Sequence, residues 1–188
     1  GEELGYCLKL LAIAKLKNGG LELRVHPALL PTSHPLSSIQ GAYNGIYLTG
    51  DLIGETLFYG KGAGANPTAS SVIADIVSIA EGKGEALNWM KAVKNRKIND
   101  IGELRTKYYF RFMALDKPGV LARIAASLGK HGISILSCIQ KEREKKVVPV
   151  VMLTHWAKGS SVQAVLKEID RLSVIKEKTV VIRVEESE

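Results

Sequence analysis

Residues 109–124 read YFRFMALDKPGVLARI, and this stretch decides the fold of the C-terminal part of the chain. Its aromatic and apolar first half predicts a strand over residues 108–115. The Asp-Lys-Pro-Gly sequence that follows predicts a turn, because proline and glycine favour the backbone angles of turns. Apolar residues then recur at helical spacing at Leu121, Ile124 and Leu128, so we expect a helix, which ends at His131 and Gly132.

The same kind of pattern continues to the C-terminus. Further strands are predicted over residues 133–141, 147–155 and 180–184. Ser160 and Gln163 match a capping box, and the helix after them has apolar residues along one face. The order βαββαβ predicts a four-stranded antiparallel sheet with both helices on one face, which is the ferredoxin-like arrangement of an α+β protein.

The N-terminal part follows other patterns. The spacing of Leu4, Leu8 and Leu11 predicts a helix over residues 3–17, ended by the glycines at 19 and 20. Alternating apolar and charged residues predict a strand over residues 21–25. Residues 26–38 contain three prolines and two histidines, and we interpret them as an ordered loop.

Residues 42–82 combine a predicted hairpin with a helix. Strands are expected over 44–49 and 55–59, on either side of a turn at Gly50 and Asp51. The glycine-rich stretch at 59–68 leads into a helix that runs to about residue 81, with Asn66 as its N-cap and Pro67 in its first turn.

The net charge of +7 is not gathered in one place. Residues 1–82 carry 5 basic and 7 acidic side chains, whereas residues 107–188 carry 15 and 9. The Lys- and Asn-rich segment 83–106, with a short helix expected near 86–93, reads as a linker. No aromatic residues are interleaved with the basic clusters, so we do not expect a nucleic-acid partner.

Other features bear on where the protein resides. No apolar run reaches the roughly 18 to 20 residues that span a bilayer. Cys7 and Cys138 each sit in an apolar pattern, which predicts small buried side chains, and the default expectation is a cytoplasmic protein without disulfides. The chain starts with Gly1 rather than Met, so we expect an incomplete chain.

The C-terminal pattern resembles a known family. The run from Tyr109 to Ile124 is similar to the start of an ACT domain, and Gly132-Ile-Ser-Ile135 resembles the second strand of that family. Upstream, residues 4–15, the run Arg24-Val-His-Pro27 and the glycine-rich stretch at 59–69 resemble homoserine dehydrogenase. The resemblance implies three segments: the end of a catalytic domain at 1–82, a linker at 83–106 and an ACT domain at 107–188.

Homoserine dehydrogenases interconvert aspartate 4-semialdehyde and homoserine with NADPH or NADH, on the way to threonine and methionine. Their N-terminal Rossmann domain and catalytic lysine are not recognisable in this sequence. Gly60, Gly62 and Gly64 match the Rossmann fingerprint only loosely, and the required βαβ unit is absent. The resemblance therefore implies that the cofactor, NADP or NAD, is bound mainly outside this chain, and that the chain alone is inactive.

The resemblance also implies a cofactor contact. In the family the glycine-rich turn approaches the nicotinamide end of the cofactor, which implies a role for Gly62, Ala63 and Gly64. Thr68 follows this turn, and we expect it either to hydrogen-bond near the cofactor or to cap the helix. Glycine allows a ligand to come close to the backbone, and the following helix offers free N–H groups. The alternative is a tight strand-to-helix turn that contacts no ligand.

An effector site is implied in the ACT domain. ACT domains bind a small amino acid between paired domains, at the loop after the first strand and the helix behind it. Backbone N–H groups at Gly119, Val120 and Leu121 suit its carboxylate, and Asp116 suits its ammonium group. Ser134 and Ile135 are expected at the same interface. Threonine is the leading effector by resemblance, and the alternative is an ACT domain that only mediates dimerisation.

Other candidate residues have simpler interpretations. The four histidines do not form a metal-ligand spacing. Lys9 and Lys15 are expected to be structural rather than catalytic, and His26 to contribute to packing or dimer contacts. A homodimer or higher homo-oligomer is the family-based expectation. The rival functions are a stand-alone amino-acid sensor and an ACT-bearing part of another enzyme, such as an aspartate kinase.

Overall fold

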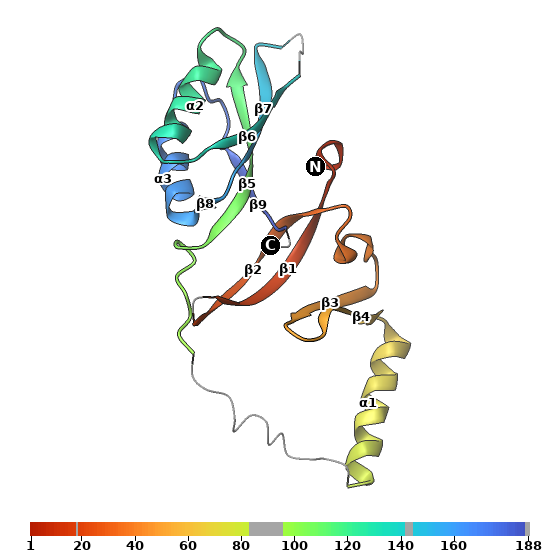
Figure 1. Cartoon of the computed structure of the whole chain (residues 1–188). Coiled ribbons are helices and arrows are strands. Elements are labelled where there is room, and N and C mark those ends of the chain that lie inside the picture. Colours follow the sequence, from red (N-terminus) through yellow and green to blue (C-terminus); the bar gives the residue numbers. More distant parts are fainter. Residues whose placement is uncertain (18, 83–95, 142–144, 187–188) are drawn as a thin grey trace. The chain divides into compact units, whose positions relative to one another are not determined.

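The computed structural model describes residues 1–17, 19–82, 96–141 and 145–186 (Figure 1). The chain forms two compact units, which are described separately. The first unit consists of Gly1–Leu30 and Arg96–Glu188, and the second unit consists of Pro31–Asn95. The helix expected near residues 86–93 lies outside the described residues.

The C-terminal part of the first unit has the predicted βαββαβ order. Its strands pair antiparallel in the order β9-β5-β7-β6, as a ferredoxin-like sheet requires. The strands are β5 (Arg105–Leu115), β6 (Ile135–Gln140), β7 (Val147–Thr154) and β9 (Val180–Val184), and the helices are α2 (Val120–Lys130) and α3 (Gly159–Ile169). A two-residue strand, β8 (Ala157–Lys158), pairs with the start of β5.

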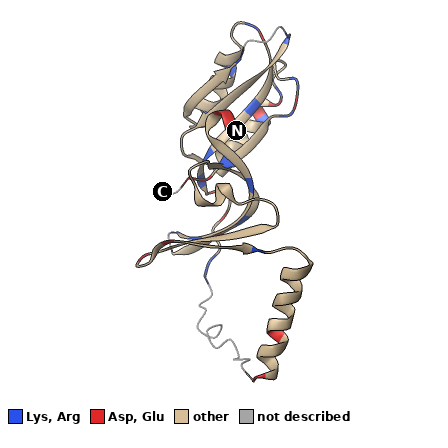
Figure 2. Ribbon diagram, turned by 90° about the vertical axis from the view of Figure 1, so that its right-hand side faces the viewer, with Lys and Arg blue, Asp and Glu red and all other residues tan. Residues whose placement is uncertain are grey.

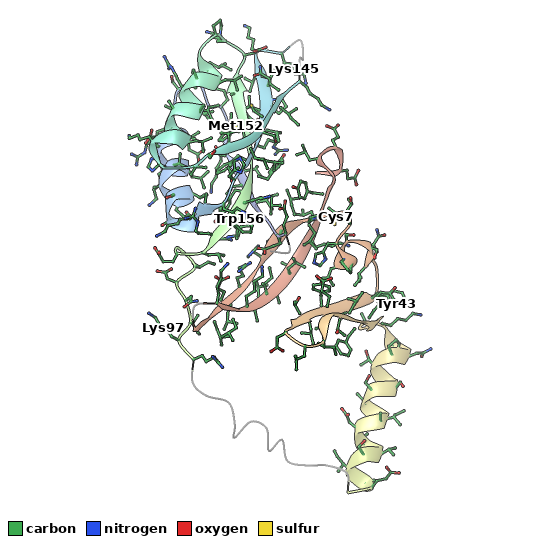
Figure 3. All side chains as sticks on the ribbon, in the orientation of Figure 1. Cys7, Tyr43, Lys97, Lys145, Met152 and Trp156 are labelled. Carbon is green, nitrogen blue, oxygen red and sulfur yellow. The ribbon has the colours of Figure 1, made fainter. Side chains whose placement is uncertain are left out.

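Helices α2 and α3 cover one face of this sheet (Figure 1). Alternate residues of β5, Phe110, Phe112 and Ala114, are fully buried beneath them. Met152 of β7 lies in the same core, between the sheet and the helices (Figure 3). The apolar side chains on one face of the strands thus pack against the apolar faces of α2 and α3 in a single core.

The predicted capping box at Ser160 is wrong. Helix α3 begins at Gly159, after Lys158, and no side chain caps it. The Gly159 N–H donates to the Leu104 carbonyl at 2.9 Å, and the Ser160 N–H donates to the Gly102 carbonyl at 2.8 Å. Backbone carbonyls therefore accept hydrogen bonds from the first N–H groups of the helix, in place of a capping side chain.

The predicted helix over residues 3–17 is also wrong. After a short 3-10 helix, η1 (Glu2–Leu4), the chain forms strand β1 (Tyr6–Lys17). Residues 7–13 alternate between half-buried and exposed, with Leu11 and Ile13 among the half-buried positions. The run is apolar on both strand faces, so helical spacing occurs in it by chance. The positive φ of 73° at Gly19 falls in the connection between two paired strands rather than at a helix end.

Strand β2 (Gly20–Pro31) contains the strand predicted over residues 21–25 and continues beyond it. The interpretation of residues 26–31 as a loop is wrong, because Ala28 and Leu29 pair in parallel with Arg183 and Val184 of β9. Strands β1 and β2 thereby extend the four-stranded sheet past β9. Pro27 lies inside this strand and does not interrupt it, and Pro31 is its last residue.

Residues after Arg96 also join the first unit. The Leu21 N–H donates to the Lys97 carbonyl, and the Asn99 N–H donates to the Leu21 carbonyl, both at 2.8 Å. The Asn99 side chain donates to the Lys17 carbonyl at 3.1 Å. By packing, residues 1–30 belong with residues 96–188 in one unit. The family resemblance instead places residues 1–82 together as one segment.

The second unit contains the predicted hairpin and helix. Strands β3 (Tyr43–Gly50) and β4 (Gly54–Lys61) pair antiparallel, and α1 (Ala65–Ala80) follows. A 3-10 helix, η2 (Pro35–Ser38), begins where the His34 side chain accepts the Leu36 N–H at 3.1 Å. The prediction of Asn66 as the N-cap is wrong, because Gly64 occupies that position and Asn66 lies inside α1.

Charged residues are interspersed over the strands and helices of the first unit (Figure 2). Helix α1 of the second unit is largely uncharged and contains Asp75 as its acidic residue (Figure 2). No helix among the described residues is long and apolar enough to cross a membrane.

Candidate effector and cofactor sites

A pocket of about 430 Å³ opens at the N-terminus of α2. Four residues predicted as effector contacts line it: Asp116, Gly119, Val120 and Leu121. The turn that carries them is anchored, because the Leu115 N–H donates to the Val174 carbonyl and the Asp116 N–H to the Lys146 carbonyl. Gly119 adopts φ 83°, a left-handed angle that glycine reaches without strain.

The pocket pairs an acidic group with a helix N-terminus. Helix α2 begins without a side-chain cap, and the Val120 N–H makes a long hydrogen bond, 3.3 Å, to the Lys117 carbonyl. The helix dipole and its first N–H groups favour a bound anion there. The exposed carboxylate of Asp116 favours a cation. The arrangement suits a small zwitterion.

The sequence interpretation missed Gln140, which also lines this pocket. Its side-chain amide donates to the Asp116 carboxylate at 3.0 Å and so orients it. Gln140 ends β6, and its partner Val150 pairs in turn with Phe112. Only the strand register brings Gln140 to Asp116, and the sequence carries no local signal of that register.

Ser134 and Ile135 do not line this pocket. Ile135 pairs with Thr154 at one end of β7, whereas Leu115 pairs with Val147 at the other end. Seven residues of strand separate these positions, which is roughly 23 Å at about 3.3 Å per residue. Ser134 is exposed, and its carbonyl accepts the His155 N–H.

The candidate cofactor turn lies in the second unit, and its residues are exposed. The Gly62 N–H donates to the Ala42 carbonyl at 3.1 Å, and a Cβ at Gly62 would lie 1.8 Å from Nδ2 of Asn44. Gly64 has φ 120° and ψ 153°, and its carbonyl accepts the Thr68 N–H. Local packing thus accounts for both glycines, while the exposed turn and the uncapped helix behind it leave room for a ligand to approach.

Several other candidate residues have structural roles. Lys15 forms an ion pair with Glu185 at 3.6 Å. Both cysteines are free, and Cys138 is exposed on the edge strand β6, so the prediction of a buried side chain there is wrong. His131 lies at the C-terminus of α2, where its Nε2 contacts Glu168 at 3.0 Å. Hydrogen bonds from His131, Ser127 and Lys130 lower the pKa of Glu168 to about 2.

Comparison with known proteins identifies two regions. Residues 1–77 match the family model described as homoserine dehydrogenase, and residues 108–174 match the model described as ACT domain. A homoserine dehydrogenase of Synechocystis is 38% identical over 97% of this chain and 45% of its own length. One of Neisseria gonorrhoeae is 38% identical over 98% of this chain and 44% of its own length. The chain thus spans less than half the length of these relatives.

A solved structure agrees with this match. The homoserine dehydrogenase of Thiobacillus denitrificans superimposes with a TM-score of 0.84 and is 38% identical. The alignment covers 98% of this chain and 43% of that one.

Proposed function

We propose a function from the premise that this chain corresponds to the C-terminal part of homoserine dehydrogenases and carries an ACT domain. In this proposal it serves a cytoplasmic enzyme that interconverts aspartate 4-semialdehyde and homoserine with NADPH or NADH. Residues 1–82 form the end of the catalytic domain, 83–106 the linker and 107–188 the regulatory domain. The identity of 38% to enzymes of that name over nearly the whole chain carries the proposal.

The nicotinamide cofactor, when bound, supplies or accepts the hydride. The part of this chain that faces it is the turn at Gly62, Ala63 and Gly64, with Thr68 in the first turn of α1. Their exposure and the uncapped helix N-terminus support this role. The residues that bind the nucleotide and move the proton lie, in this proposal, in the part of the relatives that the chain does not span. The 188 residues alone then do not catalyse the reaction.

The regulatory part of the proposal concerns the pocket at the N-terminus of α2. Threonine is the proposed effector, with its carboxylate at the start of α2 and its ammonium group at Asp116. In a homodimer the exposed edge strand β6 of a second copy would bring Ser134 and Ile135 toward the ligand. Feedback requires threonine to bind one arrangement of the paired domains more tightly than another.

Calorimetric titration of the 188-residue chain with threonine tests this regulation. Serine, methionine and isoleucine serve as comparison ligands. We expect saturable threonine binding that is lost in Asp116→Ala and in Gly119→Asp, which places a carboxylate beside the anion position. Glu103→Ala is the matched control, since it removes an exposed carboxylate at the opposite end of β5, where its ion pair with Lys158 contributes little.

The second candidate function is an ACT module that only mediates dimerisation. The exposed edge strand β6 favours it, because an unpaired edge readily pairs with a second copy. Absence of binding by all four amino acids, together with a concentration-dependent dimer in sedimentation, would favour this alternative. Threonine binding without dimerisation would favour the stand-alone sensor.

A further inference from the structure

A second pocket in the first unit, of about 390 Å³, has no role in the proposed function. It lies beside the first turn of α3, and strands β1, β2, β5 and β9 contribute to its lining. Four of its lining residues have polar side chains: Gln163 comes from α3, and His26, Tyr108 and Arg183 come from three neighbouring strands.

The strand register brings these side chains together. Tyr108 of β5 pairs directly with Arg183 of β9, and Arg183 pairs with Ala28 of β2. His26 precedes Ala28 by two residues, so it lies on the same face of the sheet. This is the face that α2 and α3 cover, since Tyr108 belongs to their core. The three residues therefore form a polar row across the sheet, beside the apolar core.

The polar ends of this row have no hydrogen-bond partner within the ranges that the structure describes. Nε2 of His26, the hydroxyl of Tyr108 and Nε of Arg183 are each buried without a hydrogen bond among the described residues. Tyr108 as a whole is only 3% exposed. The Arg183 guanidinium lies 5.9 Å from the centre of the Tyr108 ring, which favours the cation but leaves its Nε–H unpaired. Unpartnered buried groups are rare, and three of the five among the described residues belong to side chains that line this one pocket, which favours a polar ligand there.

The hydrogen-bonding character of each group follows from its surroundings. Nδ1 of His26 lies 3.0 Å from the Pro27 carbonyl, which only accepts, so Nδ1 carries the proton. Burial lowers the pKa of His26, which keeps the ring neutral and makes Nε2 an acceptor. The Arg183 guanidinium only donates hydrogen bonds, and the Tyr108 hydroxyl can donate or accept. The pocket thus offers a cationic donor, a hydroxyl and a neutral acceptor.

The charge of the pocket favours an anion. The neighbouring Arg24 is matched by Glu22 and Glu185. In the part of the chain that the structure describes, no carboxylate forms an ion pair with Arg183. A ligand carboxylate would supply that missing charge.

We infer that this pocket binds a small carboxylate that also carries a hydroxyl or ammonium group. The carboxylate accepts from Arg183 and Tyr108, and the second group donates to Nε2 of His26. The site is separate from the pocket at the N-terminus of α2. His26 lies in the region that matches homoserine dehydrogenase, and Tyr108 lies in the region that matches the ACT domain. A ligand bound to both residues would therefore link these two regions.

Nuclear magnetic resonance of the histidine imidazole nitrogens tests this inference on the 188-residue chain. The His26 signal is identified by its loss in His26→Gln. The probes are glycine and glycolate, each of which has both groups, acetate, which lacks the donor, and methylammonium, which lacks the carboxylate. We expect glycine or glycolate to shift the Nε2 signal of His26 saturably, acetate to bind more weakly and methylammonium not to bind.

Variants then assign the contacts. Arg183→Gln should weaken binding of the probe roughly tenfold or more, because a charge-assisted hydrogen bond is lost. Tyr108→Phe should weaken it less, without lowering the melting temperature of the free chain, since no described residue hydrogen-bonds the hydroxyl. Arg111→Gln and Tyr109→Phe are the matched controls on the opposite face of β5, and neither should change binding. Asp116→Ala should also leave it unchanged, which separates this site from the proposed effector pocket.

Two results would overturn the inference. In the first, no probe moves the His26 signal and Tyr108→Phe lowers the melting temperature, which is the behaviour of a pocket that holds only water. In the second, the probes shift the signal equally in the wild-type chain and in Arg183→Gln, so that the contact is not with this pocket.

Discussion

Gly64 combines a position at the start of α1 with backbone angles that only glycine adopts easily. At φ 120° and ψ 153° a Cβ is strained, although the nearest atom to it, in Pro67, is 3.4 Å away. We expect Gly64→Ala to destabilise the turn by about 1–3 kcal/mol, measured by chemical denaturation. Gly60→Ala is the control, since it has open space and no positive φ. Equal effects of the two substitutions would contradict this account.

Arg24 is a buried residue whose charge is matched by Glu185. Its guanidinium nitrogen donates to both carboxylate oxygens, at 2.9 and 2.7 Å, and the Arg24 side chain is 2% exposed. We expect Arg24→Met to cost about 3–5 kcal/mol in the free energy of unfolding, because Glu185 loses its bidentate partner and keeps the longer ion pair to Lys15, at 3.6 Å. The double variant Arg24→Met/Glu185→Leu should recover part of that loss. If the double variant is no more stable than Arg24→Met, the buried carboxylate of Glu185 is not the cause of the lost stability.

At the residue scale, the sequence singled out four neighbouring residues that line the pocket at the N-terminus of α2 and missed Gln140. Asp116, Gly119, Val120 and Leu121 follow one another in one turn, so a motif finds them. Gln140 reaches the same pocket through strand pairing, and no local motif reports that pairing.

Glu168 links the two helices that cover the sheet. Its carboxylate accepts from Ser127 at 2.9 Å, contacts Lys130 and His131, and is about one-third exposed. Its pKa, about 2 in the folded chain, lies below the ordinary value of 4.5. A depressed pKa means that this contribution to stability is present above pH 4.5 and is lost as pH falls toward 2.

Glu168→Gln tests this linkage. We expect a lower melting temperature than wild type at pH 7, and a difference that shrinks between pH 4.5 and pH 2. Glu103→Gln, at an exposed ion pair, is the matched control. A difference that stays constant down to pH 2 would show that the charge of Glu168 is not what links α2 to α3.

At the scale of elements, the sequence predicts the ACT region better than the N-terminal strands. Strand β5 alternates buried and less buried residues because one face meets α2 and α3, so its period is visible. Strand β1 is apolar on both faces, and its long run satisfies helical and strand spacing alike. Pairing with β2, rather than propensity, decides its structure.

Helix α1 presents apolar side chains that the second unit does not cover. Ile73, Ile76 and Ile79 are 60, 59 and 73% exposed. We expect the 188-residue chain to bind a dye that fluoresces on apolar surfaces, and Ile73→Glu/Ile76→Glu to reduce that signal. Ser78→Glu adds charge to the same helix without removing an apolar side chain. Equal loss of signal in this control would point to net charge as the cause.

At the scale of the whole molecule, the two units differ in how many of their side chains are buried. The first unit holds a continuous core between its sheet and two helices. No residue of the second unit that the structure describes is buried, and its helix and hairpin depend on local hydrogen bonds. This division is not visible in composition, since both units contain many apolar residues. It arises because burial depends on which elements meet, and pattern alone does not report that.

Unequal burial predicts unequal protection of the backbone. Amide hydrogens in β3, β4 and α1 should exchange much faster than those of β5 and β7, because opening a segment without a core costs little free energy. Hydrogen–deuterium exchange followed by mass spectrometry of the 188-residue chain measures this directly, with α2 as the internal reference for a helix packed on a core. Slow exchange in α1, comparable to that in α2, would mean that α1 is covered in solution, by a second copy if the protection rises with protein concentration. Fast exchange in α1 beside slow exchange in α2 would place the stability of the chain in the first unit and leave the apolar face of α1 free to pack against another part of the proposed enzyme.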